Sequence, residues 1–150
     1  MAKNVIWHGE RIKKKYRSAV PKALTIVGAQ AVTFVKDLTR VGTPESTGIK
    51  GYAGGLLKSS IAFATTLADA KAVKEEKKTA QQEDLISPPD DSFHLKIGTA
   101  VHYAPHVEYG TKRGHTGFFT TGAPFLRPGV LNNQNVLGKL FAKSMQGLVK

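Results

Sequence analysis

The sequence contains no cysteine, one tryptophan and two methionines among its 150 residues. Without thiols, neither a disulfide nor a thiolate metal site can stabilise the fold. No apolar run approaches the roughly 20 residues that cross a bilayer, and no apolar stretch follows Lys3 as it would in a signal peptide. We therefore expect a soluble chain, made in the cytoplasm, that has no membrane partner.

Acidic residues are also scarce, at 11 against 22 lysines and arginines, which leaves a net charge of +11. Seven of the 11 lie between Leu67 and Asp91, a stretch with only four lysines, so the rest of the chain has 18 basic and four acidic side chains. A basic body of this kind favours polyanionic partners, although the same charge could simply keep the surface soluble.

The length and the 41% hydrophobic content fit a single domain over residues 1–150 with a real core. Residues 8–40 predict a long helix, because apolar residues recur at steps of three and four. The expected inward face is Tyr16, Val20, Leu24, Val27, Ala31, Val35 and Leu38. Pro21 leaves two alternatives: a helix that begins near Ser18, or a longer helix that kinks at the proline. Gly42 and Pro44 are expected to end it.

Two stretches alternate apolar and polar residues with the period of a strand, residues 57–67 and 93–97. Between them, residues 68–86 favour a helix with a thin apolar stripe, which we expect to be an exposed excursion. A short helical turn should follow within residues 99–109, and residues 110–124 should form a long loop. Pro128 can open a last helix whose inward face is Asn133, Leu137, Leu140, Phe141, Ser144 and Leu148. The predicted fold is α+β, with the two terminal helices packed on a small antiparallel sheet.

Few residues are arranged for chemistry. His102, His106 and Glu108 have a spacing that could bind zinc, but Pro105 lies between the histidines and no glutamate follows the first one. There is no nucleophile elbow, and the carboxylates of residues 67–91 have a solvated pattern. The glycine-rich residues 42–55 lack the spacing of a phosphate-binding loop. We expect no enzyme, no catalytic residue, no metal and no cofactor.

Three elements of the chain resemble a known family. They are PESTGIKGYAGGLLKSSI from Pro44, LKIGTAVHYAPHVEYGT from Leu95 and APFLRPGV from Ala123. Their order resembles the gene-ten-like minor tail component family of lambdoid siphophages, the tail-completion or head–tail joining group. The matching residues of the first element are Pro44, Thr47, Gly48, Gly55, Leu57, Ser60 and Ile61. Those of the second are Tyr103, Ala104, Val107, Glu108, Tyr109, Gly110 and Thr111, and those of the third are Pro124, Phe125, Leu126, Arg127 and Pro128.

The chain departs from the family pattern in two places. Residues 49–54 split the first element, and residues 68–91 are longer than expected between the strands. The resemblance implies a structural virion protein of the tail or neck, present in the host cytoplasm during assembly. It implies a homo-oligomeric ring, of hexameric order, between the head connector or stopper and the tail terminator, with DNA passing through. A nonspecific DNA-binding protein of a phage or mobile element is the alternative, because the basic body has no base-reading motif.

Two groups of residues are expected to carry this role. Interface or loop-fixing residues are Tyr103, Glu108, Tyr109, Gly110, Thr111, Phe125, Arg127 and Pro128. Glu108 and Arg127 should bond to each other, or each to the backbone of a neighbouring loop, unless both are merely solvated. Lys13, Lys14 and Lys15 should face DNA or an acidic neighbour, and the acids of residues 68–91 should project outward or dock on another ring.

Overall fold

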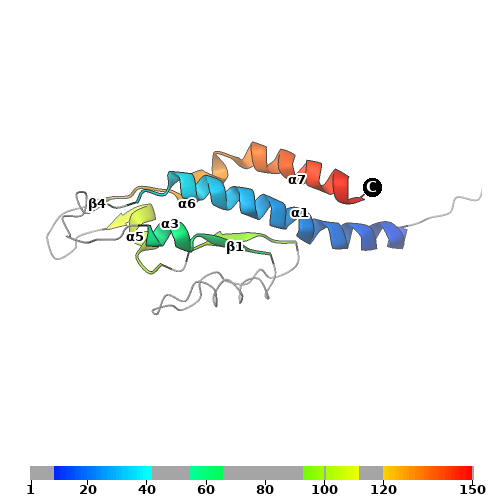
Figure 1. Ribbon diagram of the computed structural model, residues 1–150, viewed down its shortest axis with the longest axis horizontal. Helices are drawn as coiled ribbons and strands as arrows, with labels where there is room; N and C mark the ends of the chain where they lie inside the picture. The colour runs from blue at the N-terminus through cyan, green and yellow to red at the C-terminus, as the bar shows by residue number, and fades with distance from the viewer. Residues whose placement is uncertain (1–8, 42–54, 66–92, 100, 112–119, 150) are drawn as a thin grey trace, which may run out of the picture.

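The computed structural model describes residues 9–41, 55–65, 93–99, 101–111 and 120–149 of the chain. The long helix α1 lies in the middle, with α6 and α7 on one side and the strands, α3 and α5 on the other (Figure 1). The described residues are mostly helical with small antiparallel strand pairs, so the predicted α+β class is confirmed. The predicted excursion at residues 68–86 lies outside the described residues.

Helix α1 runs from Gly9 to Leu38 and continues through Pro21, so the longer of the two alternatives is correct. Its buried face advances mainly in four-residue steps, through Ala19, Ala23, Val27, Ala31 and Val35. The predicted inward face is wrong at its ends, because Tyr16 and Leu38 are 47% and 46% exposed. The first turns extend past the end of α7 and past the sheet, so no described element covers them (Figure 1).

The end of α1 also differs from the prediction, since it comes before Gly42 and Pro44. The backbone N–H of Thr39 donates to the carbonyls of Val35 and Lys36. The Thr39 hydroxyl also donates to the Val35 carbonyl, at 2.8 Å, and this threonine is buried. A side chain thus completes the last turn where we expected a glycine to do so.

By length and composition alone, α1 could cross a membrane, since it contains an 18-residue window of mean hydropathy 1.3. The expectation that no segment reaches that length therefore needs correction. The evidence for a membrane is weak, because core helices of soluble proteins pass the same test. Here α1 packs against α7, α6 and both strands of the first pair.

The predicted strand over residues 57–67 is wrong in its first half. Residues Leu56–Ser60 form the short helix α3, and only Ala62–Ala64 form a strand, β1. Gly55 precedes α3 with a φ of 104°, a left-handed conformation that glycine adopts without a Cβ clash. Leu57 and Ile61, four residues apart, are both buried in the core. Their spacing fits a helix as well as an alternating strand, which explains the wrong prediction.

The second predicted strand is confirmed with a shift of position. Strand β2 spans Lys96–Gly98 and pairs antiparallel with β1, with Phe63 opposite Ile97. This pair packs against α1 at Gly28, where an added Cβ would lie 2.5 Å from the Phe63 ring. The missing side chain lets the sheet approach the helix closely.

Residues 101–124 contain more structure than predicted. The expected helical turn is present as α5, Ala104–Tyr109. The expected loop after it holds a second antiparallel pair, in which β3 (Gly110–Thr111) lies opposite β4 (Thr120–Thr121). Gly110, between α5 and β3, has a φ of 78°, a conformation that glycine adopts without a Cβ clash.

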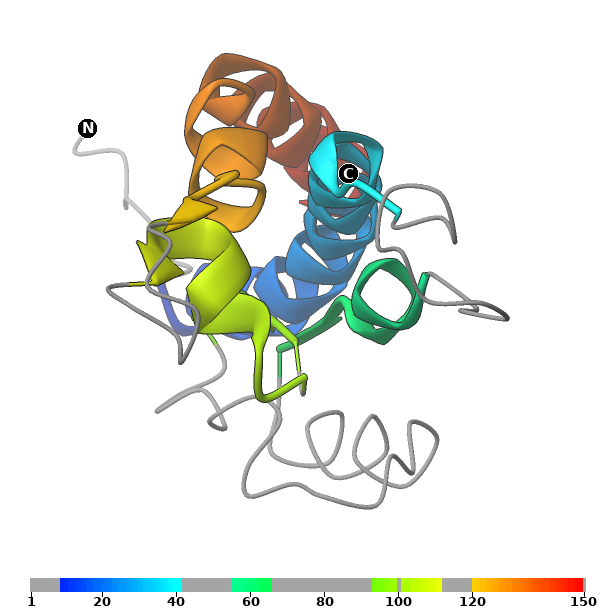
Figure 2. The same cartoon turned by 90° about the vertical axis from the view of Figure 1, so that its left-hand side faces the viewer.

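The predicted last helix is two helices, α6 (Leu126–Leu131) and α7 (Gln134–Val149). Pro128 lies in the first turn of α6, where its missing N–H breaks no helical bond. Helix α7 runs back along α1 with Leu137 buried and Leu140 and Phe141 against the same cluster, as predicted (Figure 2). Leu148, near the end of the predicted inward face, is exposed.

Gly138 and Gly147 of α7 have no neighbour that would meet an added Cβ within 4 Å. Each glycine costs the helix backbone entropy and contributes no packing in return. We therefore expect Gly138→Ala and Gly147→Ala each to raise the free energy of unfolding by about 0.5–1 kcal/mol. Urea unfolding followed by circular dichroism measures both; a loss of stability in either would show that the helix needs its glycine.

Candidate functional site

The most specialised arrangement in the described residues surrounds the Glu108 carboxylate, which lies on α5 and is 7% exposed. Its Oε2 accepts hydrogen bonds from the backbone N–H groups of Phe125, at 2.7 Å, and Leu126, at 3.0 Å. Its Oε1 accepts one from the backbone N–H of Arg127, at 3.0 Å. One side chain thus binds three successive N–H groups of a segment 17 to 19 residues away.

These three N–H groups stand at the start of α6, where a helix has donors without intrahelical acceptors. Phe125 supplies no side-chain cap, so the carboxylate of a distant residue takes that role. A negative charge at a helix N-terminus is also favoured by the partial positive charge there. We call this arrangement, Glu108 with the N–H groups of residues 125–127, the Glu108 clamp.

The backbone beside the clamp is closely packed. The N–H of Ala123 donates to the carbonyl of Val107 at 2.7 Å. A Cβ added to Gly122 would lie 2.7 Å from the Glu108 carbonyl oxygen and 2.8 Å from the Gly110 nitrogen. Only a glycine lets these two backbone segments approach each other this closely. The segment before α6 is therefore held by backbone contacts as well as by the carboxylate.

Burial by itself raises the pKa of Glu108, because it disfavours the charged form. The hydrogen bonds from Phe125, Leu126 and Arg127, and the positive charge of Arg127, act in the opposite direction and prevail. The pKa of Glu108 is therefore lowered from its ordinary value of 4.5. The carboxylate is ionised at neutral pH and holds the clamp as an anion.

Of the two arrangements predicted for Glu108 and Arg127, backbone bonding is correct for Glu108. The structure shows no ion pair between the two side chains, both of which it describes, and the Arg127 side chain is exposed. Its charge still helps to lower the pKa of Glu108. The alternative in which the two side chains bond to each other is wrong, because backbone N–H groups already occupy the carboxylate.

The other predicted interface residues divide into buried and exposed members. Phe125 is 2% exposed and belongs to the core, and Tyr103 packs against that cluster. Tyr109, by contrast, is 77% exposed, the highest value among the exposed large hydrophobic residues. Exposed tyrosine and arginine are common anchors of protein interfaces, so Tyr109 and Arg127 are the members available to a partner.

The described parts of the three sequence elements of the family resemblance come together in one core cluster. This cluster includes Leu57 and Ile61 of the first element. It also includes Val101 and Ala104 of the second and Phe125 of the third. The Ser60 hydroxyl also bonds to the Thr99 hydroxyl, and so joins α3 to the segment after β2. These described parts therefore pack together, with the Glu108 clamp between the second element and the third.

The lysines predicted to face DNA do not share one side of α1. Successive residues of a helix are about 100° apart, so three consecutive lysines point in different directions. Lys13 forms an ion pair with Glu10, with 2.9 Å between Nζ and Oε1. All three lysines are exposed on the turns that extend past α7.

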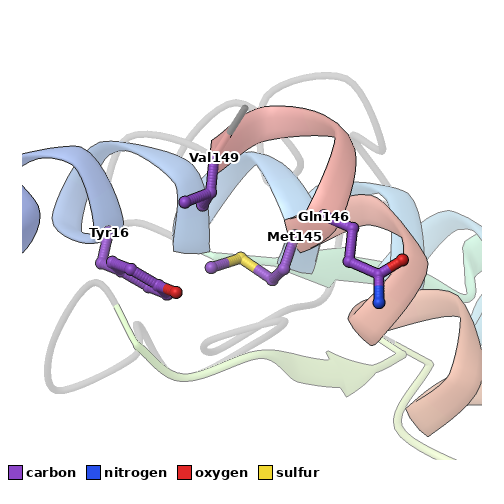
Figure 3. A pocket seen from close by; sticks show the side chains of 4 residues that line it. All are labelled: Tyr16, Met145, Gln146 and Val149. Atoms are coloured by element: carbon purple, nitrogen blue, oxygen red, sulfur yellow. The ribbon is translucent and has the colours of Figure 1, made fainter.

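Among the described residues, no group of three or more histidine or acidic side chains is placed to hold a metal ion. His102 and His106 are exposed, whereas the Glu108 carboxylate that would complete the set is bound to the backbone of α6. An open pocket of about 350 Å³ lies where the end of α7 meets α1 (Figure 3). Tyr16, Met145, Gln146 and Val149 line it, and none of these is a nucleophile with a neighbouring base.

Two glycines that matter to this region were not singled out in the sequence. Gly122 and Gly129 both stand where another backbone passes within van der Waals distance of an added Cβ. The presence of glycine before and inside α6 was the available signal. A single sequence, however, does not distinguish a glycine in a loop from a glycine at a helix crossing. Their role follows only from which chain lies beside them.

Comparisons with protein-family models, with curated proteins and with solved structures find no significant match. The family resemblance drawn from the three sequence elements therefore stays a prediction.

Proposed function

We propose that this protein is a structural virion protein that completes the tail at the head–tail junction of a tailed phage. In this role several copies form a ring, of hexameric order by resemblance, through which DNA passes. Its partners are the head connector or stopper on one side and the tail terminator on the other. It needs no cofactor and has no catalytic residue.

One observation carries the proposal: the described parts of the three elements meet in one core, and a buried carboxylate of the second element binds the backbone of the third. Side chains used in this way shape a surface and leave no reactive group in a cleft. The clamp sets the direction of α6 and of the exposed Tyr109 and Arg127 beside it. A precisely shaped, rigid surface is what a subunit of a closed ring needs.

The test is the location and copy number of the chain in particles. Tailed particles produced from the genome that encodes it should contain the chain at the neck, in several copies around the particle axis. Particles made without it should carry filled heads that lack joined tails. Free protein can remain monomeric in light scattering without affecting this test, because partners complete the ring. A single copy in a cryo-EM map, or its absence from particles, would contradict the proposal.

A second function, nonspecific DNA binding outside any particle, is favoured by the cations of α1. It predicts a chain that binds duplex DNA and is missing from purified particles. Mass spectrometry of particles freed of external DNA by nuclease separates the two functions.

A further inference from the structure

One long side of α1 remains without a packing partner among the described elements. Helices α6 and α7 and the first strand pair all pack on other sides of α1 (Figure 2). The remaining side follows steps of three and four residues and holds the cations Arg11, Lys15, Lys22 and Lys36, with Lys14 at its margin. We call this side, from Arg11 to Lys36, the α1 outer face.

The residues between these cations are small and polar or small and apolar: Ser18, Thr25, Ala29 and Thr33, all exposed. The three hydroxyls donate back to carbonyls of their own helix, those of Lys15, Pro21 and Ala29, at 2.9 to 3.1 Å. They are therefore engaged with the helix itself and add no bulk. At about 1.5 Å per residue, the face extends for about 37 Å.

Within α1, acidic residues lie away from most of this face. Helix α1 contains two acids, Glu10 and Asp37. Glu10 pairs with Lys13, which is directed away from the outer face, and Asp37 lies at the far end beside Lys36. The α1 outer face is therefore a row of positive charges separated by small side chains.

We infer that the α1 outer face is a binding surface for the phosphate backbone of double-stranded DNA. The inference deepens the proposed function, on which it rests for the kind of polyanion. A duplex carries one negative charge per about 1.7 Å of its axis, so a row of cations of this length can meet several phosphates. The small residues let the duplex approach the helix surface closely.

A second copy of the chain fits the face less well. Protein interfaces have a core of several apolar and aromatic residues, whereas Ile26 is the exposed large apolar residue of α1 that borders this face. The acidic stretch of residues 67–91 fits less well too, because it contains four lysines beside its seven acidic residues. These lysines would be repelled by a cationic face. A uniformly charged polyanion has no such conflict.

The face carries no apparatus for reading bases. Specific contacts in the major groove use arginine, asparagine or glutamine in bidentate pairs, whereas the middle of this face has a lysine, hydroxyls already bonded to the helix, and alanine. We therefore expect contact with phosphates alone. Affinity should not depend on sequence and should fall steeply with salt.

The test compares two double variants of the full-length chain. Lys15→Gln with Lys22→Gln removes two charges from the middle and N-terminal part of the face. Lys139→Gln with Lys143→Gln removes two exposed charges from α7 and serves as the matched control. Glutamine is about as good a helix former as lysine, so both variants should keep the wild-type melting temperature.

Fluorescence anisotropy of a labelled random-sequence duplex, titrated between 25 and 200 mM salt (about one decade of ionic strength), measures the slope of log K against log salt. In the face variant we expect this slope to be smaller by about 2 and the affinity at 0.1 M salt to be roughly 50-fold lower. The control should keep the wild-type slope. Equal losses in both variants would overturn the inference, because binding would then follow net charge alone.

Two further outcomes have a fixed meaning. If the face variant keeps its DNA affinity but loses self-association in light scattering, the face binds a second copy and the inference is wrong. If the chain is absent from particles while the face variant still loses DNA affinity, the neck role fails and the binding surface stands.

Discussion

Replacing Glu108 with alanine is expected to lower the free energy of unfolding by about 2–4 kcal/mol. The alanine leaves the N–H groups of Phe125, Leu126 and Arg127 without their acceptor, and burial keeps water from replacing it fully. Each buried donor without a partner costs on the order of 1 kcal/mol or more, and the favourable charge at the start of α6 is lost as well. Chemical unfolding of both proteins gives the difference directly.

Glu108→Gln separates shape from charge. The amide oxygen can still accept from the backbone, but the amide nitrogen cannot, so at least one of the three hydrogen bonds is lost. We expect a cost of about 1–2 kcal/mol, between wild type and the alanine variant. A glutamine variant as stable as wild type would show that the negative charge contributes nothing.

The matched control is Arg127→Ala. This substitution keeps the backbone N–H that donates to Glu108 and removes only an exposed guanidinium that lowers the pKa of Glu108 through its charge. A charge interaction near the surface is screened, so the stability loss should stay below about 0.5 kcal/mol. If Arg127→Ala costs as much as Glu108→Ala, the clamp depends on the two side chains together and our assignment of the hydrogen bonds is wrong.

The clamp also gives stability a pH dependence of known sign. The pKa of Glu108 is lower in the folded chain than its ordinary value of 4.5, so the folded state holds the proton less tightly than the unfolded state does. The contribution of Glu108 is then fully present above about pH 4.5 and is lost as the pH falls through the folded-state pKa. Wild type and Glu108→Gln should converge in stability below pH 4.5, and a constant gap from pH 7 to pH 3 would contradict this.

Gly129→Ala is expected to destabilise the chain by about 2–3 kcal/mol, although alanine is the better helix former. Gly129 is buried in α6 where that helix crosses α1, and an added Cβ would lie 2.9 Å from the Cα of Val35 and 2.8 Å from its Cγ2. Because a backbone atom stands in the way, the helices must move apart. Their separation would open the core around Val35 and Phe125.

The control for this prediction lies in the next helix, α7. Gly138→Ala makes the same chemical change in α7, at a position where the added Cβ meets nothing within 4 Å. The two substitutions should therefore have opposite signs in the same unfolding measurement. Gly28→Ala should fall between them, since the nearest atoms there belong to the side chains of Phe63 and Leu95, which can adjust. Equal effects at Gly129 and Gly138 would mean that the α1–α6 crossing is not as close as described.

Much of the helical framework could be predicted from the sequence. The apolar spacing around Val27, Ala31 and Val35 specified α1, and that around Leu137 and Phe141 specified α7. Both signals depend on local periodicity, which is repeated often enough in a long helix to outweigh single exceptions such as Pro21. Short elements lack this repetition, and α3 was accordingly predicted as a strand.

The sequence also singled out Glu108, because it is an isolated acid in a basic part of the chain. It could not name the partner, since the choice between the Arg127 side chain and the backbone of residues 125–127 depends on how α5 and α6 meet. The same limit applies to the lysines of α1, because the packing of the other elements on α1 decides which of these lysines lie on its open side.

By itself, the sequence determined the α+β class, the two long helices and the importance of Glu108. Tertiary structure alone decided which backbone the carboxylate holds, which glycines permit close crossings and which side of α1 stays open. The physical reason is that periodicity and turn preferences act between residues near in sequence. The Glu108 clamp, the close helix crossings and the open side of α1 depend on contacts between segments distant in sequence, such as 104–109 and 125–131. The sequence does not specify how such segments are placed relative to each other.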